Sequence, residues 1–153
     1  MTITTKVFGE VSIDDDKIIH FPGGIIGFPD LTDFAMLHDE EDSISAIHWL
    51  QSIQEPAFAM PVMDPLIVKE DYNPEVDDEL LKPLGELTHE ETLVLVTLTV
   101  PQDLTKMTCN LKAPIIINAD TLKGCHMIAD NDEYVVKYPI YDIIKSASKK
   151  GGE

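Results

Sequence analysis

Arginine is absent from the sequence, and all 11 of its basic residues are lysines. They stand against 28 aspartates and glutamates, which gives a formal net charge of −17. Bidentate recognition of phosphates and guanine edges relies on arginine, and nucleic-acid binding needs a basic surface. The composition therefore argues against direct binding of DNA or RNA and favours a basic protein partner. Solubility alone is the other explanation of the acidic charge.

Cysteine and long apolar runs are also scarce. The two cysteines, Cys109 and Cys125, fit none of the close-spaced zinc or redox patterns, so we expect free thiols. No stretch approaches the roughly 18 apolar residues that span a bilayer, and the first residues lack the apolar core of a signal peptide. These absences predict a cytoplasmic protein with no membrane partner.

The remaining composition is that of an ordinary globular protein, with 153 residues of which 44% are hydrophobic. This length can bury a core within one domain. We predict a single β-rich domain over residues 1–144. Residues 145–153, rich in Ser, Lys and Gly, are predicted to form a flexible tail.

About ten short apolar and β-branched segments, separated by turn residues, predict an all-β, mainly antiparallel sandwich or pseudo-barrel. The longest segment, residues 92–100, is expected at the centre. Three isoleucines at residues 115–117 predict a strand buried on both faces, with the amides of Asn110 and Asn118 bonding backbone near its ends. Further strands are expected at residues 3–8, 11–13, 18–21, 34–37, 44–51, 57–63, 105–111, 125–129 and 133–138.

One short helix is predicted near residues 73–84. Asn73 suits the N-cap, Pro74 suits the first helical position, and Gly85 suits the end. Acidic residues in the first turns favour the same assignment because the helix dipole attracts negative charge there.

Residue types that carry catalysis are present but not grouped. None of the five histidines has another at the offsets that gather metal ligands, and Ser52 lacks the glycines of a nucleophile elbow. The glycine-rich segment at residues 21–28 lacks the phosphate-binding spacing. We therefore predict no enzyme, no cofactor and no metal. A small β-scaffold hydrolase or metal-dependent enzyme, with Asp, Glu and His converging only in the fold, is the alternative. The histidines are His20, His38, His48, His89 and His126.

Several short segments together resemble the FliW family of flagellar assembly factors, in the family's order. They are FPGGIIGF at residues 21–28, HWLQS at 48–52 with Asp64 and Pro65 after it, DYNP at 71–74, and NLKAPIIIN at 110–118. The resemblance covers roughly residues 6–138. It departs at His126, where the family suggests Gln, and at lysines that stand where members often carry arginine.

The resemblance implies a non-catalytic adaptor. Proteins similar to FliW bind the dimeric RNA-binding regulator CsrA, relieve its repression of flagellin mRNA translation, and also bind flagellin. On that reading, flagellin synthesis is coupled to flagellar assembly. The resemblance favours allosteric antagonism of CsrA, and direct competition with RNA is the rival mechanism.

Two sets of residues follow as candidates. Asp71, Tyr72 and the acids Asp77, Asp78 and Glu79 would form a partner-binding patch with one aromatic anchor and a charged rim. A helix cap with a solvated face is the alternative explanation of that set. The second set matches the family's motifs and is expected to hold the fold: Phe21, Pro22, Gly27, Trp49, Leu50, Gln51, Ser52, Asn110, Pro114 and Asn118.

Overall fold

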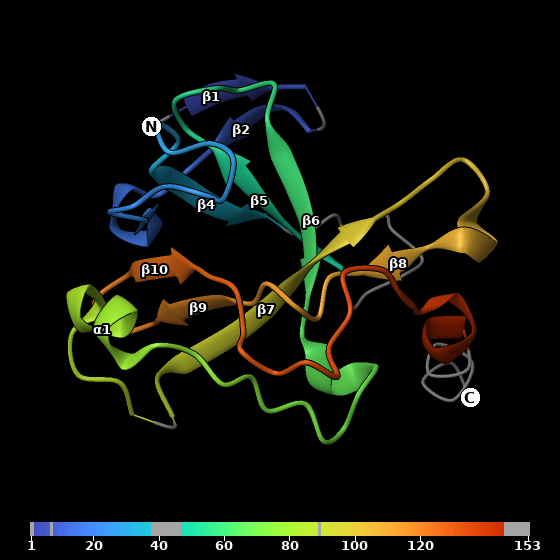
Figure 1. Cartoon of the computed structure of the whole chain (residues 1–153). Helices are drawn as coiled ribbons and strands as arrows, with labels where there is room; N and C mark the ends of the chain where they lie inside the picture. The colour runs from blue at the N-terminus through green and yellow to red at the C-terminus, as the bar shows by residue number, and fades with distance from the viewer. Residues whose placement is uncertain (1, 7, 38–46, 89, 146–153) are drawn as a thin grey trace.

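A computed structural model describes residues 2–6, 8–37, 47–88 and 90–145. Its centre is a closed barrel of seven strands in the order β7, β6, β5, β4, β3, β10, β9 and back to β7 (Figure 1). All neighbouring strands in the barrel are antiparallel except the parallel pair β3 and β10. The strands are β3 (Ile19–His20), β4 (Asp33–Leu37), β5 (His48–Ser52), β6 (Ala59–Met63), β7 (Thr92–Thr99), β9 (Ile115–Asn118) and β10 (Lys123–His126).

The prediction of an all-β, mainly antiparallel fold is thus confirmed, and closure makes it a barrel. Residues 44–46 of the strand predicted at residues 44–51 lie outside the described residues. Only residue 145 of the predicted tail is described, and residues 141–145 are helical.

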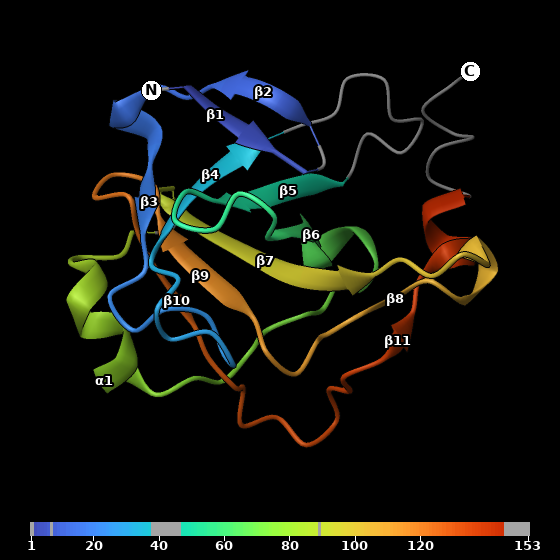
Figure 2. The ribbon, with the colours of Figure 1, turned by 90° about the horizontal axis from the view of Figure 1, so that it is seen from above.

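Four short strands lie outside the barrel (Figure 2). The hairpin of β1 (Thr2–Thr5) and β2 (Gly9–Ser12) lies beside β4 and β5, where the ring of Phe8 meets Trp49 edge-on at 6.0 Å. At the far end of β7, β8 (Thr108–Cys109) and β11 (Tyr138–Pro139) extend the sheet. The β1–β2 hairpin is thus a separate small sheet, and β8 and β11 continue the barrel sheet beyond β7.

The strand predicted at residues 105–111 is wrong in extent, because residues 104–106 form a 3₁₀ turn and only β8 remains. The predicted helix and the last predicted strand are also wrong in extent. The helix does not begin at Asn73: α1 covers Asp78–Leu81 with Asp77 as its N-cap, and a 3₁₀ turn, η3 (Lys82–Leu84), follows. The strand predicted at residues 133–138 survives only as β11. One cause accounts for both. Residues 73–75 form hydrogen bonds with residues 130–134, and the backbone of residue 111 bonds to residue 135, so neither segment adopts the regular helix or strand that its sequence predicts.

Further 3₁₀ turns connect the strands. Each begins after an aspartate whose carboxylate accepts a hydrogen bond from the backbone two residues on, as N-capping predicts. They are η1 (Asp15–Lys17), η2 (Pro65–Ile67) and η4 (Leu104–Lys106).

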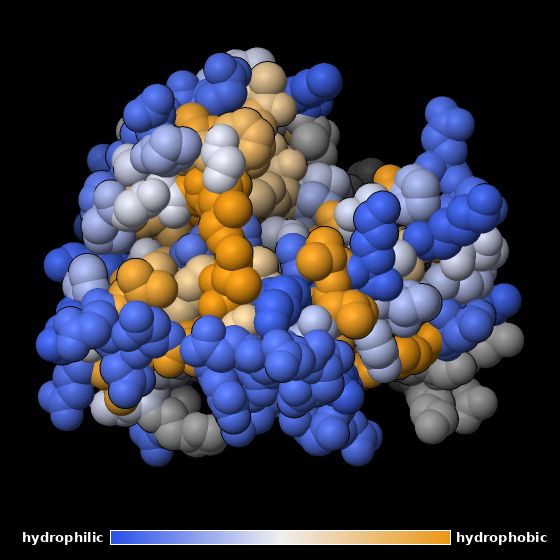
Figure 3. Space-filling view, viewed as in Figure 1, coloured by the Kyte–Doolittle hydropathy of each residue, from blue (hydrophilic) through white to orange (hydrophobic). Residues whose placement is uncertain are grey.

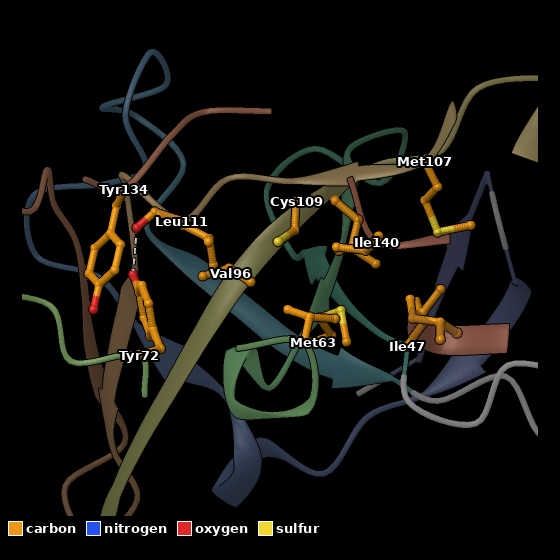
Figure 4. Packing of buried hydrophobic residues seen from close by; sticks show 12 residues of the cluster. Ile47, Met63, Tyr72, Val96, Met107, Cys109, Leu111, Tyr134 and Ile140 are labelled. Atoms are coloured by element: carbon orange, nitrogen blue, oxygen red, sulfur yellow. Dashed lines mark hydrogen bonds between the residues drawn. The ribbon is translucent and has the colours of Figure 1, made fainter. Parts of the chain in front are cut away.

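The long strand β7 separates two apolar clusters. Leu95 points into the barrel with Phe34, Leu50 and Ile115, whereas Val96 packs on the other side. Figure 4 shows that second cluster, in which residues of β6, β7 and β8 meet Ile140 from the end of the chain. Because successive side chains of a strand point to opposite faces, β7 contributes buried residues to both clusters.

Strand β9 has no exposed residue. Ile115 and Ile117 lie in the barrel interior, and Ile116 packs outward against Leu84 and Met127. The strand is paired on one side with β7 and on the other with β10. This confirms the predicted strand buried on both faces.

Phe21 fills the barrel interior beneath β10. It is fully buried, and its ring meets Phe34 edge-on with 5.5 Å between centroids. A Cβ at Gly124 would stand 2.7 Å from that ring, so only glycine lets β10 approach Phe21. The first family motif is therefore anchored in the core by its first residue.

Asn118 joins the end of β9 to the segment after α1. Its Nδ2 donates to the carbonyls of Leu84 (2.8 Å) and Glu86 (3.0 Å), and its Oδ1 accepts from the backbone of Asp120 (2.9 Å) and Thr121 (3.3 Å). The side chain is fully buried. Every hydrogen-bonding position of the amide is used.

The loop at residues 22–29 bends back on itself and is held at its tip by a histidine. Gly24 takes a positive φ of +71°, and a Cβ there would meet the Pro29 carbonyl oxygen at 2.5 Å. The backbone N–H of Ile26 donates to Nδ1 of His126 at 3.2 Å. Burial lowers the pKa of His126, and the Ala113 backbone opposes that shift only in part. The bond to Ile26 therefore needs the neutral ring with its proton on Nε2.

We expect Asn118→Ala to lower the free energy of unfolding by about 2–4 kcal/mol, since it leaves buried carbonyl and N–H groups without a partner. Urea unfolding measures this change. Asn73→Ala is the matched control, because the side chain of Asn73 is exposed, and it should change stability by less than about 0.5 kcal/mol. Equal losses of unfolding free energy in the two variants would contradict a stabilising role for the hydrogen bonds of Asn118.

His126 predicts a specific dependence of stability on pH. Its folded pKa lies below the ordinary unfolded value, so the unfolded chain binds more protons and stability falls as the pH drops through that value. Unfolding free energies at about pH 7.5 and about pH 5.5 should therefore differ more in the parent chain than in His126→Gln. Parallel pH profiles for the two proteins would show that His126 does not titrate against folding.

Candidate functional site

The second family motif lies on β5, in the barrel wall. Leu50, Gln51 and Ser52 are fully buried. The Gln51 amide donates to the carbonyls of Ser52, Pro56 and Phe58 at 3.0–3.1 Å, and the hydroxyl of Ser52 accepts from the backbone of Glu55 at 3.0 Å. These contacts shape the turn between β5 and β6. The polar residues of the motif therefore form hydrogen bonds with the backbone and point away from solvent.

The fourth motif, at residues 110–118, is arranged in the same way around β9. Oδ1 of Asn110 accepts from the backbone of Lys112 (3.0 Å) and Ala113 (3.1 Å), and Pro114 is buried directly before the strand. With Asn118 at the other end, the predicted bonding of both amides to backbone is confirmed. Among the other motif residues, Trp49 is half-buried, whereas Pro22 and Gly27 are exposed in the loop at residues 22–29.

Tyr72 does not form the exposed aromatic anchor that the sequence suggested. The residue is only 7% exposed, its ring packs on Tyr134 at 4.6 Å, and its hydroxyl donates to the Leu111 carbonyl at 2.6 Å (Figure 4). Burial, together with the neighbouring Tyr134, raises the pKa of Tyr72 above its usual range. The tyrosine therefore belongs to the core and positions the chain beside it.

The four acidic residues of the predicted patch are all exposed, but their roles differ. Asp77 caps α1 by accepting from the backbone of Glu79 at 2.9 Å, and Glu79 pairs with Lys82 at 2.9 Å. Asp71 pairs with Lys69 at 3.2 Å, and this hydrogen bond raises the pKa of Lys69. Asp78 lies in the first turn of α1. The structure thus shows a cap and a solvated face, and partner binding by these residues stays a prediction.

Residues 69–77 and 128–137, two irregular segments, lie side by side and are joined through Asn131 and Tyr134. Oδ1 of Asn131 accepts from the backbone of Glu75 (2.6 Å), and its Nδ2 donates to the Asn73 carbonyl (3.2 Å). The Tyr134 hydroxyl accepts from the backbone of Asn73 (2.6 Å). We call the surface of these two segments the paired-loop face. The sequence analysis did not identify this face, because no local pattern links two segments about 60 residues apart.

The paired-loop face carries both acidic and apolar side chains on its surface. Figure 3 shows a dense hydrophilic area where the two segments run across the front, with apolar side chains bordering it. Ile128 and Val136 are the most exposed large apolar residues of the described chain, at 61% and 57%. A surface of this composition suits protein contact better than solvent alone.

No metal site is assembled among the described residues, which contain no group of three or more His, Cys, Asp or Glu side chains within reach of one ion. His20 bonds Asp33 at 2.7 Å on the surface, far in sequence from His126, and His38 and His89 lie outside the described residues. The alternative of a converging hydrolase or metal site thus has no support from the residues described.

The two cysteines provide no activated thiol, because burial raises the pKa of both. Both thiols are free, as predicted, and burial raises the pKa of Cys109 to about 12, which makes it a poor nucleophile. A hollow of about 290 Å³ lies between η1 and β4, and it is lined by Ser12, Ile13, Asp14, Lys17, Ala35, Met36 and Leu37. None of the helices in the described ranges has the length and apolar character that a membrane crossing requires.

The comparisons with known proteins agree with this fold. A sequence model of the family described as FliW protein matches residues 2–140. The flagellar assembly factor FliW of Lachnospira eligens is 54% identical over 148 residues, covering 95% of this chain and 97% of the relative. That of Lachnoclostridium phytofermentans is 48% identical over 151 residues, covering 98% and 97%.

A solved structure supports the same assignment. The crystal structure of a flagellar assembly factor FliW superposes with a TM-score of 0.84 at 30% identity, covering 92% of this chain and 96% of the other. The barrel, the buried motif residues and these matches over nearly the whole length lead to one conclusion: the chain belongs to the FliW family of flagellar assembly factors.

Proposed function

We propose that this chain is a non-catalytic cytoplasmic adaptor that binds the dimeric regulator CsrA and relieves its repression of flagellin mRNA translation. It also binds flagellin, so that free flagellin releases the regulator and limits further synthesis. Membership of the flagellar assembly factor family is the observation that carries this proposal. The surface charge and the buried state of the polar motif residues support it.

The electrostatics suit an RNA-binding partner. A protein that binds RNA presents basic surface, and this chain has a formal net charge of −17 without a single arginine. Opposite fields accelerate the encounter of the two proteins and fix their orientation. In the complex, the carboxylates of the adaptor would also repel an approaching RNA backbone. That repulsion weakens RNA binding even where the adaptor does not cover the RNA site.

Two mechanisms of antagonism give different complexes. In allosteric antagonism, the adaptor and RNA occupy separate sites on CsrA and each lowers the affinity for the other by the same factor. In direct competition the two ligands exclude each other entirely. We propose the allosteric mechanism, in which excess RNA weakens adaptor binding only to a limiting value.

Calorimetric titration against CsrA from the same organism tests the proposal. We expect a dissociation constant of about 1 µM or lower near 50 mM salt, rising about tenfold or more near 300 mM salt because screening weakens charge attraction. The same titration at several RNA concentrations separates the mechanisms. No heat and no co-elution at tens of micromolar, roughly the range of weak encounters, would contradict CsrA binding.

Coupling to flagellin predicts displacement. Purified monomeric flagellin added to a preformed adaptor–CsrA complex should release CsrA, which size-exclusion chromatography resolves. Bovine serum albumin at equal concentration serves as the control for non-specific release. A stable complex of all three proteins would show that flagellin and CsrA do not compete for the adaptor.

A further inference from the structure

The paired-loop face is ordered by contacts that leave its outer surface free. The chain at residues 128–137 is anchored at both ends to the same short stretch, because the Ala129 N–H donates to the Lys112 carbonyl at 2.7 Å and the Leu111 N–H donates to the Val135 carbonyl at 3.0 Å. Between these anchors, Asn131 and the tyrosine pair join it to residues 73–75. Irregular backbone held this firmly loses little entropy on binding.

The charge on this face is strongly one-sided. Its two segments contain seven acidic residues, all exposed, against two lysines. Lys69 is already paired with Asp71, and the neighbouring Lys112 donates its ammonium to the Asn131 carbonyl at 2.8 Å. The face therefore holds uncompensated negative charge. The acids are Glu70, Asp71, Glu75, Asp77, Asp130, Asp132 and Glu133.

Exposed apolar side chains lie on the same segment as several of these acids. Ile128 and the pair Val135 and Val136 are exposed, whereas the residues between them that face inward, Ala129 and Tyr134, are buried. The alternation shows that the inward positions anchor the segment and the outward positions remain unpartnered. Exposed β-branched residues beside exposed carboxylates match the mixture of apolar and charged side chains found at protein interfaces.

We propose that the paired-loop face is the docking surface for a cationic protein surface that carries apolar side chains of its own. This inference rests on the proposed function, in which the basic partner is the RNA-binding regulator. Charge selects the occupant: a second copy of this chain would bring like charges together, and a nucleic acid would be repelled. Only a lysine- or arginine-rich protein surface complements both the acids and the apolar residues.

The test uses pairs of exposed residues in the full chain. Asp130→Asn with Asp132→Asn removes two charges from the face, and Ile128→Ser with Val136→Ser removes its two most exposed apolar side chains. The control for charge is Glu10→Gln with Asp120→Asn, and the control for apolar area is Val100→Ser with Leu104→Ser, all exposed outside the face. Each protein is titrated with CsrA at two salt concentrations, and separately with monomeric flagellin, after its melting temperature has been shown to match the parent.

Both variants of the face should weaken binding roughly tenfold, while both controls stay within about twofold of the parent. The charge variant should also show a smaller salt dependence. If the parent binds and the variants bind equally well, the docking surface is refuted while the proposed function stands. If the parent itself does not bind, the proposed function fails. Loss of flagellin binding with CsrA binding intact would assign the face to the other partner and overturn this inference.

Discussion

Pairing of β9 on both sides is the constraint on which the barrel depends. The strand bonds β7 on one edge and β10 on the other, and it is buried on both faces. A barrel has no free edge only if one strand bridges its first and last members. Here that strand consists of isoleucines and ends at Asn118, whose amide fixes the chain after α1. Barrel closure and attachment of the helix thus depend on the four consecutive residues of β9.

The polar residues of the family motifs form hydrogen bonds with main-chain groups. Gln51, Asn110 and Asn118 each bond two or more main-chain groups, and Ser52 bonds one. Such residues appear functional in a sequence because they are polar and lie near apolar runs. In the structure they satisfy backbone groups that irregular turns leave unpaired, which is costly when those groups are buried. The exposed surface is therefore formed mainly by acidic and apolar residues other than these polar motif residues.

The absence of arginine and the excess of carboxylates affect function because they set the charge of the protein surface. Acidic residues gather where two irregular segments run side by side, and Tyr72 and Tyr134 support them from beneath. A rigid acidic face has a fixed pattern of charge, which selects among basic partners better than a mobile acidic tail. This combination connects the packing of a buried tyrosine pair with the partner chemistry proposed above.

The sequence by itself determined the all-β class, the doubly buried strand at residues 115–117, the backbone-bonding amides of Asn110 and Asn118, and the acidic charge. These depend on local periodicity, residue propensity and composition. Only the tertiary structure decided that β3 and β10, about a hundred residues apart, pair to close the barrel. It also turned Tyr72 inward and moved the helix start from Asn73 to Asp77. Those outcomes depend on distant partners, Tyr134, Asn131 and Leu111, which supply hydrogen bonds that outweigh the local preferences of residues 72–77.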